Sequence, residues 1–260
     1  MKAKKSFGQN WLRDDATLDE IVAAAELSIR DTVLEVGPGL GTLTSKLVKK
    51  AGKVVAVEAD QDLIPYLLDQ AAKVNNLEIV RGDILKFDLT KLPAGYKVVA
   101  NIPYYLTSNL IRNLLEASNP PTAMVLLVQK EVAERIVAGP GQMSVLSFSV
   151  QYYGEATIVR DVSRELFDPV PQVDSAIIKI MRHTEPVFAA DTRLLFRLVK
   201  AGFGEKRKML RNSLSGGLHV DQSAIEELLT AAQISPTARA QELSMQQWRD
   251  LYTAAKTVLQ

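Results

Sequence analysis

The tetrad Asn101-Ile102-Pro103-Tyr104 combines groups that together could hold a nucleobase amine. Asn101 has a side-chain carbonyl that accepts from an amine, and Pro103 stiffens the backbone so that neighbouring main-chain carbonyls can point the same way. Tyr104 offers an aromatic face on which a base can stack. An isolated Asn-x-Pro sequence is also an ordinary turn after a strand, so the tetrad gains its meaning from the residues around it.

A glycine turn has the residue types that approach a nucleotide-like cofactor. Gly37-Pro38-Gly39-Leu40-Gly41 follows a short apolar run, and the missing side chains of Gly37 and Gly39 let a ligand approach the backbone where the next helix begins. The dinucleotide-binding fingerprint requires glycine at position 42, where this chain has Thr42. The spacing therefore disfavours a nicotinamide cofactor, and the turn alone is a weak signal.

Two acidic residues end the next two predicted strands. Glu58 could accept both hydroxyls of a ribose, and Asp83 could accept from the amino group of an adenine, with Ile84 covering the face of the ring. Each acid taken alone could equally be a surface or loop residue. With the glycine turn and the tetrad, they predict a ligand at one edge of a sheet.

These residues require parallel strands that end side by side. Apolar runs and helical patterns alternate along the first part of the chain, which is typical of a doubly wound α/β sheet with ligands at its carboxyl edge. The predicted strands are residues 31–36, 53–58, 77–81, 97–100, 123–129, 155–160 and 175–181. The predicted helices among them are residues 16–27, 42–50, 63–72, 106–117, 131–137 and 144–153.

The character of the sequence changes near residues 183–190. Helical patterns then follow with few β-rich runs, over residues 192–201, 206–214, 222–232 and 245–259. We therefore predict two domains, an α/β domain over residues 1–185 and a helical domain over residues 186–260.

Positive charge gathers in the helical part, although the net charge is only +1. Residues 193–211 carry seven basic side chains against the single acid Glu205. A second basic patch consists of Lys2, Lys4 and Lys5. Both patches could contact phosphates, and both could equally be solvated surface.

The composition excludes several classes of protein. A chain of 260 residues with 47% hydrophobic and 23% charged residues is typical of globular proteins. The lack of cysteine excludes disulfides and thiolate metal sites, and the two histidines, His183 and His219, lie far from any acidic cluster, so we expect no metal. The start is basic and polar, and no apolar run approaches the ~18 residues that span a bilayer, so we expect a cytoplasmic protein without a membrane partner.

The ordered motifs resemble those of the ribosomal RNA adenine dimethyltransferases over nearly the whole chain. They are Gly8–Leu12, the glycine turn, the tetrad, Val128–Arg135, Val173–Ser175 and Lys206–Asn212. The sequence is most similar to the small-subunit, kasugamycin-type enzymes, and the erythromycin-resistance large-subunit enzymes are the nearest alternative. The resemblance implies a Rossmann-like, S-adenosylmethionine-binding catalytic domain over residues 1–185 and an RNA-binding helical domain over residues 186–260.

The resemblance also assigns roles to single residues. S-adenosylmethionine would contact Asn10, Leu12, Gly37, Gly39, Glu58, Asp83, Ile84 and Asn101, and Gln9 would help to close a lid. Trp11 stands where the family usually has phenylalanine, and Tyr105–Ser108 replaces a common Asn-Ile-Ser-Thr segment. The segment 139–144 is also shorter than the common pattern, which leaves the details of the substrate loop open.

Methyl transfer to an adenine amine needs well-placed acceptors more than a strong base. We expect Asn101 Oδ1 and the main-chain carbonyl of Ile102 or Pro103 to accept the amine hydrogens, so that the nitrogen lone pair points at the methyl group. The flipped adenine would stack between Tyr104 and Phe167. Phe167 lies in a proline-rich segment predicted to be a loop, and it could instead anchor that loop to the core.

The resemblance implies a monomer that dimethylates two adjacent adenosines of small-subunit rRNA in an assembling 30S-type particle. Arg207, Lys208 and Arg211 would contact phosphates from neighbouring faces of one helix. The acids of the C-terminal helices, Glu226, Glu227 and Glu242, would face away from the RNA. A third interpretation is a weakly catalytic assembly factor with the same fold.

Overall fold

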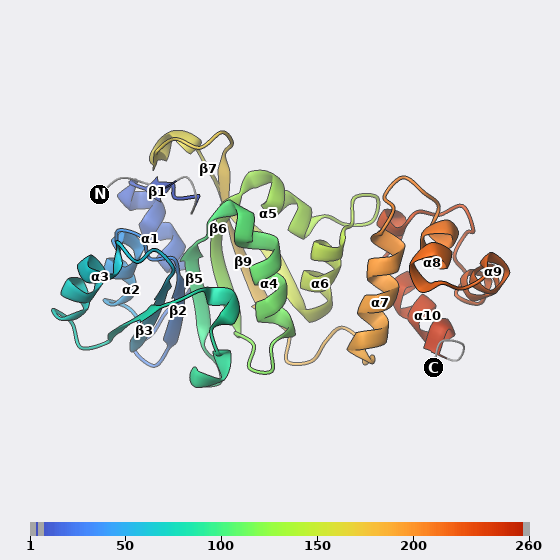
Figure 1. The fold of residues 1–260 in the computed structure, drawn as a ribbon, viewed down its shortest axis with the longest axis horizontal. Helices are drawn as coiled ribbons and strands as arrows, with labels where there is room; N and C mark the ends of the chain where they lie inside the picture. Colours follow the sequence, from blue (N-terminus) through green and yellow to red (C-terminus); the bar gives the residue numbers. More distant parts are fainter. Residues whose placement is uncertain (1–3, 5–7, 257–260) are drawn as a thin grey trace. The chain divides into compact units, whose positions relative to one another are not determined.

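The computed structural model describes residue 4 and residues 8–256, and their contacts divide into two compact units (Figure 1). Of the described residues, the first unit contains residue 4 and residues 8–134 and 155–183, and the second contains residues 135–154 and 184–256. The sequence-based division at residue 185 assigned residues 135–154 to the first domain, whereas their contacts group them with the second unit. The reason is aromatic packing, since Phe148 contacts Phe196 and Trp248 with ring centroids 5.8 and 5.7 Å away.

The first unit is built on a seven-stranded sheet with the order β4-β3-β2-β5-β6-β9-β7. The strands are β2 (Thr32–Val36), β3 (Lys53–Glu58), β4 (Leu77–Arg81), β5 (Lys97–Asn101), β6 (Ala123–Gln129), β7 (Gly154–Val162) and β9 (Ser175–Arg182). The strands from β4 to β6 are parallel, and β9 is antiparallel to β6. This arrangement confirms the predicted Rossmann-like α/β class.

Helices cover both faces of this sheet. They are α1 (Asp15–Ala24), α2 (Thr42–Leu47), α3 (Ile64–Ala71), α4 (Thr107–Glu116) and α5 (Lys130–Val137). Ile21 of α1 and Leu47 of α2 join Val33 and Val99 in one buried cluster. The buried side of α4 is absent from that cluster and packs on the opposite face (Figure 1). Side chains alternate between the faces of a strand, so each strand supplies both layers.

The carboxyl ends of four parallel neighbours meet at one edge of the sheet. Val36 of β2 lies opposite Val57 of β3, and Glu58 lies opposite Arg81 of β4. Short 3₁₀ turns follow two of these strands, η2 (Ile84–Lys86) after β4 and η4 (Tyr104–Leu106) after β5. Loop residues from segments far apart in the sequence therefore gather at this edge.

A small antiparallel ribbon adjoins the core. It consists of β1 (Trp11–Leu12) and β8 (Phe167–Asp168), with Leu12 opposite Phe167. The segment from Phe167 to Pro171 was predicted to be a loop, and the prediction was wrong for its first two residues. They pair with β1 because Leu12 and Phe167 are both apolar and are 2% and 3% exposed in the same cluster.

The second unit is helical. It contains α6 (Val145–Tyr153), α7 (Thr192–Phe203), α8 (Leu210–Leu218), α9 (Gln222–Ala231) and α10 (Met245–Lys256). The helix predicted to start at Lys206 starts instead at Leu210, because Met209 has extended backbone and forms its N-cap. Arg207 and Lys208 lie in the connection before α8, so the prediction that they share one helix with Arg211 was wrong.

Candidate active site

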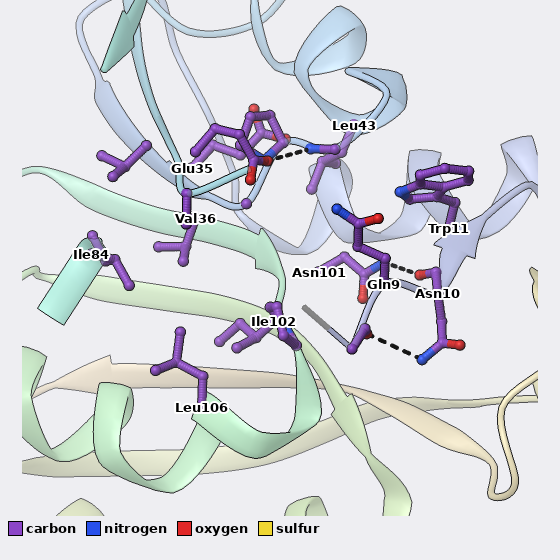
Figure 2. A pocket seen from close by; sticks show the side chains of 18 of the residues that line it. Gln9, Asn10, Trp11, Glu35, Val36, Leu43, Ile84, Asn101, Ile102 and Leu106 are labelled. Carbon is purple, nitrogen blue, oxygen red and sulfur yellow. Dashed lines mark hydrogen bonds between the residues drawn. The ribbon is translucent and has the colours of Figure 1, made fainter. Parts of the chain in front are cut away.

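A cavity of about 330 Å³ lies at the carboxyl edge of the sheet. The predicted site residues that line it are Gln9, Asn10, Leu12, Gly37, Gly39, Glu58, Asp83, Ile84, Asn101, Ile102, Pro103 and Tyr104. Figure 2 shows side chains from the N-terminal segment, from β2 and from the tetrad around the same space. The fold thus brings together residues that the sequence places in separate motifs.

The glycine turn presents its backbone to the cavity. Gly37 and Gly39 have φ angles of 65° and 59°, a region that side chains other than glycine rarely adopt. A Cβ atom on Gly39 would also lie 3.1 Å from Trp11 Nε1. Glycine at position 39 is therefore required both by the backbone conformation and by the close approach of Trp11.

Glu58 is held beside this turn by two backbone amides. Gly39 N donates to Oε2 at 3.1 Å, and Asp60 N donates to Oε1 at 2.8 Å. The residue is 5% exposed, and burial raises the pKa of Glu58. The carboxylate is oriented by these bonds, and its remaining lone pairs can accept ribose hydroxyls.

Asp83 and Ile84 stand at the end of β4. Asp83 caps η2, with Oδ1 accepting from Leu85 N at 3.0 Å, while Oδ2 can still accept a further donor. Ile84 is 8% exposed and contributes an apolar part of the wall. The Asp83 carboxylate can accept from the edge of a purine, and the Ile84 side chain can pack on its face.

The N-terminal segment closes one side of the cavity. Asn101 Nδ2 donates to Asn10 O at 3.2 Å, and Asn10 Nδ2 donates to Gly8 O at 3.3 Å (Figure 2). Gln9 Nε2 donates to Asp60 Oδ2 at 2.9 Å. These bonds tie Gly8, Gln9 and Asn10 to the ends of β5 and β3, which suits a segment that covers a bound ligand.

The tetrad has two acceptors available. Asn101 uses its amide NH₂ on Asn10, which leaves Oδ1 free to accept. Pro103 O already accepts from Leu106 N at 3.0 Å. Among the described backbone hydrogen bonds of turns and loops, none ends on Ile102 O. Of the two carbonyls expected to hold an amine, the one on Ile102 is therefore the more available.

Tyr104 is anchored through its hydroxyl. Its OH lies 2.8 Å from the Oγ of Ser175, a fully buried residue at the start of β9. Burial raises the pKa of Tyr104, so the ring stays neutral at physiological pH. A bond at the far end of the ring fixes its orientation without occupying its face.

Phe167 does not line the cavity. It is 3% exposed and belongs to the core cluster with Leu12 and Leu18. In this conformation the ring packs as a core anchor, which was the alternative interpretation of its loop. Its role as a second stacking surface stays a prediction that requires the ring to leave the core.

Sequence reasoning missed Glu35 and Tyr105. Both line the cavity, Glu35 at 1% exposure and Tyr105 at 68%. Burial raises the pKa of Glu35 to about 8 and outweighs the nearby Thr44 hydroxyl, which lowers it; within the described residues, Oε2 is buried and makes no hydrogen bond of ordinary geometry. An acid inside an otherwise apolar predicted strand was the available signal for Glu35, and the second of two adjacent tyrosines was the signal for Tyr105.

The charge of the wall is one-sided. The described lining residues include three carboxyl groups, on Glu35, Glu58 and Asp83, and no lysine, arginine or histidine. Such a wall favours a cationic ligand with hydroxyl and amine donors. It disfavours a pyrophosphate, which requires donors or positive charge.

The predicted phosphate contacts lie in the second unit and are partly paired. Lys208 Nζ lies 2.8 Å from Glu205, and Arg211 lies 2.6 Å from Glu226. The prediction that Glu226 faces away from the basic cluster was wrong, because α8 and α9 pack together and bring it to Arg211. Arg207 is exposed.

The N-terminal basic patch is described only at Lys4. Its Nζ lies 2.6 Å from carboxylate oxygens of both Asp60 and Asp62, which use much of its charge within the first unit. Lys2 and Lys5 lie outside the described residues.

Within the described part of the chain, no three His, Cys, Asp or Glu side chains are grouped so that they could hold a metal ion. No helix in residues 8–256 is both long and apolar enough to cross a membrane.

The sequence matches a family model described as "Ribosomal RNA adenine dimethylase" over residues 1–257. A curated protein of Dehalococcoides mccartyi strain CBDB1, named "Ribosomal RNA small subunit methyltransferase A", is 44% identical over 255 residues, covering 96% of this chain and 88% of the relative. A protein of the same name from Nostoc sp. is 41% identical, covering 95% and 96%.

Two solved structures are similar over nearly the whole chain. A dimethyladenosine transferase from Plasmodium falciparum has a TM-score of 0.77 at 28% identity, covering 95% of this chain and 97% of that one. The 23S rRNA methyltransferase ErmE has a TM-score of 0.74 at 30% identity, covering 95% and 100%.

Proposed function

This chain belongs to the ribosomal RNA adenine dimethylase family, and from that premise we propose that it methylates small-subunit rRNA during ribosome biogenesis. The reaction would transfer methyl groups from S-adenosylmethionine to the 6-amino groups of two adjacent adenosines in a hairpin. The small-subunit assignment is supported by identities of 44% and 41% to relatives named for that subunit, against 30% to the large-subunit enzyme ErmE.

The observation that carries this proposal is the orientation of the tetrad. The Asn101 NH₂ group donates to Asn10 O, so Oδ1 is left to accept from a ligand. Among the described residues, no turn or loop backbone hydrogen bond ends on Ile102 O. Two acceptors side by side suit an amine that has two hydrogens to donate. When both amine hydrogens are held by acceptors, the nitrogen lone pair points at the methyl group. The nitrogen can then attack the methyl carbon without a strong base.

The cavity fits S-adenosylmethionine by its donor and charge pattern. Glu58 offers acceptors for ribose hydroxyls, and Asp83 with Ile84 offers an acceptor and an apolar contact for adenine. Three carboxyl groups, with no basic side chain among the described lining residues, suit a molecule with a sulfonium and an ammonium. The bound cofactor would supply an electrophilic methyl group. The protein then has to align the adenine amine with that methyl group and to exclude water.

The remaining residues of the tetrad position the base. Tyr104, anchored on Ser175, offers the stacking surface for a flipped adenine. We propose that Gln9 and Asn10 help to close the cofactor side, since their segment already bonds to Asp60 and Asn101. Transfer of a second methyl requires the same alignment of an amine that retains one hydrogen for one of the two acceptors.

The rRNA would be held through phosphates by exposed basic side chains of the second unit, with Arg207 and Lys208 our first candidates. Arg211 remains a candidate, although Glu226 neutralises part of its charge. We propose an assembling 30S-type particle as the substrate and a monomer as the active form.

The proposal is tested with purified protein, methyl-labelled S-adenosylmethionine and two substrates, immature small subunits and protein-free large-subunit rRNA. Digestion to nucleosides should give labelled dimethyladenosine from the small subunits alone. Label only in large-subunit rRNA would move the assignment to the resistance enzymes, and no label in either would contradict the proposed reaction.

The same assay separates an enzyme from an assembly factor. Asn101→Ala should abolish labelling. If the protein acts through methylation, cells that carry this variant should also show defective small-subunit assembly. If the variant supports normal assembly without any methyl transfer, the weakly catalytic scaffold becomes the better interpretation.

A further inference from the structure

Tyr105 lines the cavity, and the proposed reaction gives it no role. Its side chain is 68% exposed, so packing in the core does not explain an aromatic residue at this position. The adjacent Tyr104 differs, because its hydroxyl is bonded to Ser175 and its ring is the predicted stacking face. A lining residue that is largely exposed lies where the cavity opens to solvent, so Tyr105 is placed to act on whatever covers that opening.

The ring of Tyr105 contacts the N-terminal segment at Gly8. A Cβ atom on Gly8 would lie 3.4 Å from Cδ1 and 3.6 Å from Cε1 of the ring, and 3.8 Å from Cβ of Pro103. One edge of the ring therefore faces the Gly8 backbone at close range. Gly8 has a φ angle of 59°, which glycine adopts at little cost, so the residue type suits the turn that makes this contact.

Hydrogen bonds connect Gly8 to the amine acceptor of the tetrad. Asn10 Nδ2 donates to Gly8 O at 3.3 Å, and Asn101 Nδ2 donates to Asn10 O at 3.2 Å (Figure 2). The second bond selects one orientation of the Asn101 amide, because half a turn of that amide would bring Oδ1 against Asn10 O, and neither oxygen can donate. The position of Asn10 O therefore decides whether Oδ1 is presented to the ligand.

We propose that Tyr105 is a positioning residue that holds Gly8 in place at the opening of the cavity. Through Asn10, this contact keeps the Asn101 amide turned with Oδ1 toward the adenine amine. The inference rests on the proposed methyl transfer and adds to it a residue that does not touch the reacting atoms. Without the ring, the turn at Gly8 moves away from the end of β5, and the Asn101 amide loses the partner that fixes its rotation.

The effect of the ring is local to this turn. Gln9 still bonds to Asp60 and Trp11 still pairs with β8 when the ring is removed, so most of the cofactor wall stays in place. Loss of the ring should therefore affect the rate of methyl transfer more than it affects cofactor binding, because transfer depends on the alignment of the acceptor.

The test compares Tyr105→Ala with Tyr105→Phe in single-turnover methylation of immature small subunits by the full chain at saturating S-adenosylmethionine. Tyr105→Ala should lower this rate by about 10–100-fold, the loss that small misplacements of reacting groups cause. Cofactor affinity, measured by calorimetry, should change much less. Tyr105→Phe keeps the ring edge that faces Gly8 and should restore the parent rate. Tyr66→Ala, which removes a partly exposed tyrosine outside the cavity, is the matched control.

A double-mutant cycle tests the path from the ring to the tetrad. Asn10→Ala removes the bond to Gly8 O, so Tyr105→Ala should lower the rate little further when residue 10 is already alanine. Independent contributions would give the same fold-change in both backgrounds. Because Tyr105 is largely exposed, its replacement should leave the urea midpoint close to that of the parent, which separates a rate defect from a folding defect.

Three results would overturn the inference. A parent-like rate for Tyr105→Ala would exclude a role of the ring. Tyr105→Phe as slow as Tyr105→Ala would assign the effect to the hydroxyl and not to the contact with Gly8. Equal fold-changes in the two backgrounds would exclude the path through Asn10. In all three cases the parent still methylates small subunits and the proposed function stands, whereas a parent that transfers no methyl group to them would reject both.

Discussion

At the scale of single residues, the site depends on which lone pairs remain unused after folding. Asn101 Oδ1 remains available because the amide bonds to Asn10 O through its NH₂ group. Ile102 O remains available because no described turn or loop backbone hydrogen bond ends on it. Glu58 is oriented by two amides, whereas Glu35 has an oxygen with none. The same sheet edge therefore carries one carboxylate oriented by hydrogen bonds and one whose second oxygen makes no hydrogen bond within the described residues.

Removing the Asn101 acceptor should lower the rate more than it lowers cofactor binding. Asn101→Ala is expected to reduce kcat by about 10²–10³-fold, the usual loss for one preorganised polar group. Single-turnover methylation of small subunits measures the rate, and calorimetry measures cofactor affinity. The control is Asn109→Ala on the exposed side of α4, which should behave like the parent. A rate within a few fold of the parent for Asn101→Ala would exclude the acceptor role.

Two variants separate the contribution of the Tyr104 hydroxyl from that of its ring face. Tyr104→Phe loses the bond to Ser175 and should cost about 1 kcal/mol of stability with a small effect on methylation. Tyr104→Ala also removes the stacking face, worth roughly 1–3 kcal/mol, and should slow methylation by roughly 5–150-fold. Tyr66→Ala on α3, away from the cavity, is the control. Equal activity of the Phe and Ala variants would contradict stacking on this ring.

Glu35 also predicts how stability varies with pH. Its folded pKa of about 8 exceeds the ordinary value of 4.5, so between these values the folded state binds more protons than the unfolded state. The free energy of unfolding should therefore fall as pH rises from about 4.5 to 8, by at most about 5 kcal/mol from this group. Denaturant unfolding of the cofactor-free protein at several pH values should show a shallower fall in Glu35→Gln. Identical pH profiles would contradict the shifted pKa.

At the scale of elements, the site is assembled by parallel strands that end together and by a short ribbon that holds the N-terminal segment. β1 pairs with β8, and this pairing brings Asn10 beside Asn101 and places Trp11 against Gly39. Phe167 belongs to the ribbon and to the core, so its burial supports the cavity wall indirectly.

Phe167 provides the test of this ribbon. Phe167→Ala should lower the free energy of unfolding by about 3–5 kcal/mol through the cavity that it leaves. Phe167→Leu keeps most of the apolar volume and should cost less than about 1.5 kcal/mol while retaining methylation. Urea unfolding and the labelling assay measure both quantities. A stable Leu variant that has lost methylation would instead support the stacking role of the ring.

At the scale of the whole molecule, the two units suit ligands of opposite charge. Among the described residues, those that line the cavity of the first unit include acidic groups and no basic ones, which suits a cationic cofactor. The segment around Arg207 in the second unit is exposed and basic, which suits a polyanion. This division keeps the net charge near zero while each surface attracts its own ligand.

Reversing the positive charges of the connection that precedes α8 should weaken rRNA binding and reduce its dependence on salt. The double variant Arg207→Glu, Lys208→Glu is expected to reduce the slope of log affinity against log salt by about 0.7–0.9 for each phosphate that the protein no longer neutralises. Filter binding to small-subunit rRNA between low and moderate salt measures the slope. Lys49→Glu, Lys50→Glu on exposed residues after α2 is the matched control. An unchanged slope in the first variant would remove this segment from the RNA-binding surface.

By itself, the sequence determined the α/β class, the strand order along the chain and the set of motifs that meet at one edge. These follow from local patterns, because short apolar runs that alternate with helical segments indicate parallel strands, and parallel neighbours place the residues after their carboxyl ends together. Glu58, Asp83 and Asn101 were therefore recognisable as one site before any contact was known.

Only the tertiary structure decided how individual groups within that pattern are used. Burial of Phe167 depends on its pairing with Leu12, the partner of Arg211 depends on the packing of α9, and the unpaired oxygen of Glu35 depends on what surrounds it in the wall. Each is set by residues distant along the chain. Local residue types cannot specify such contacts, because the energy of a buried group depends on the partners that folding brings to it.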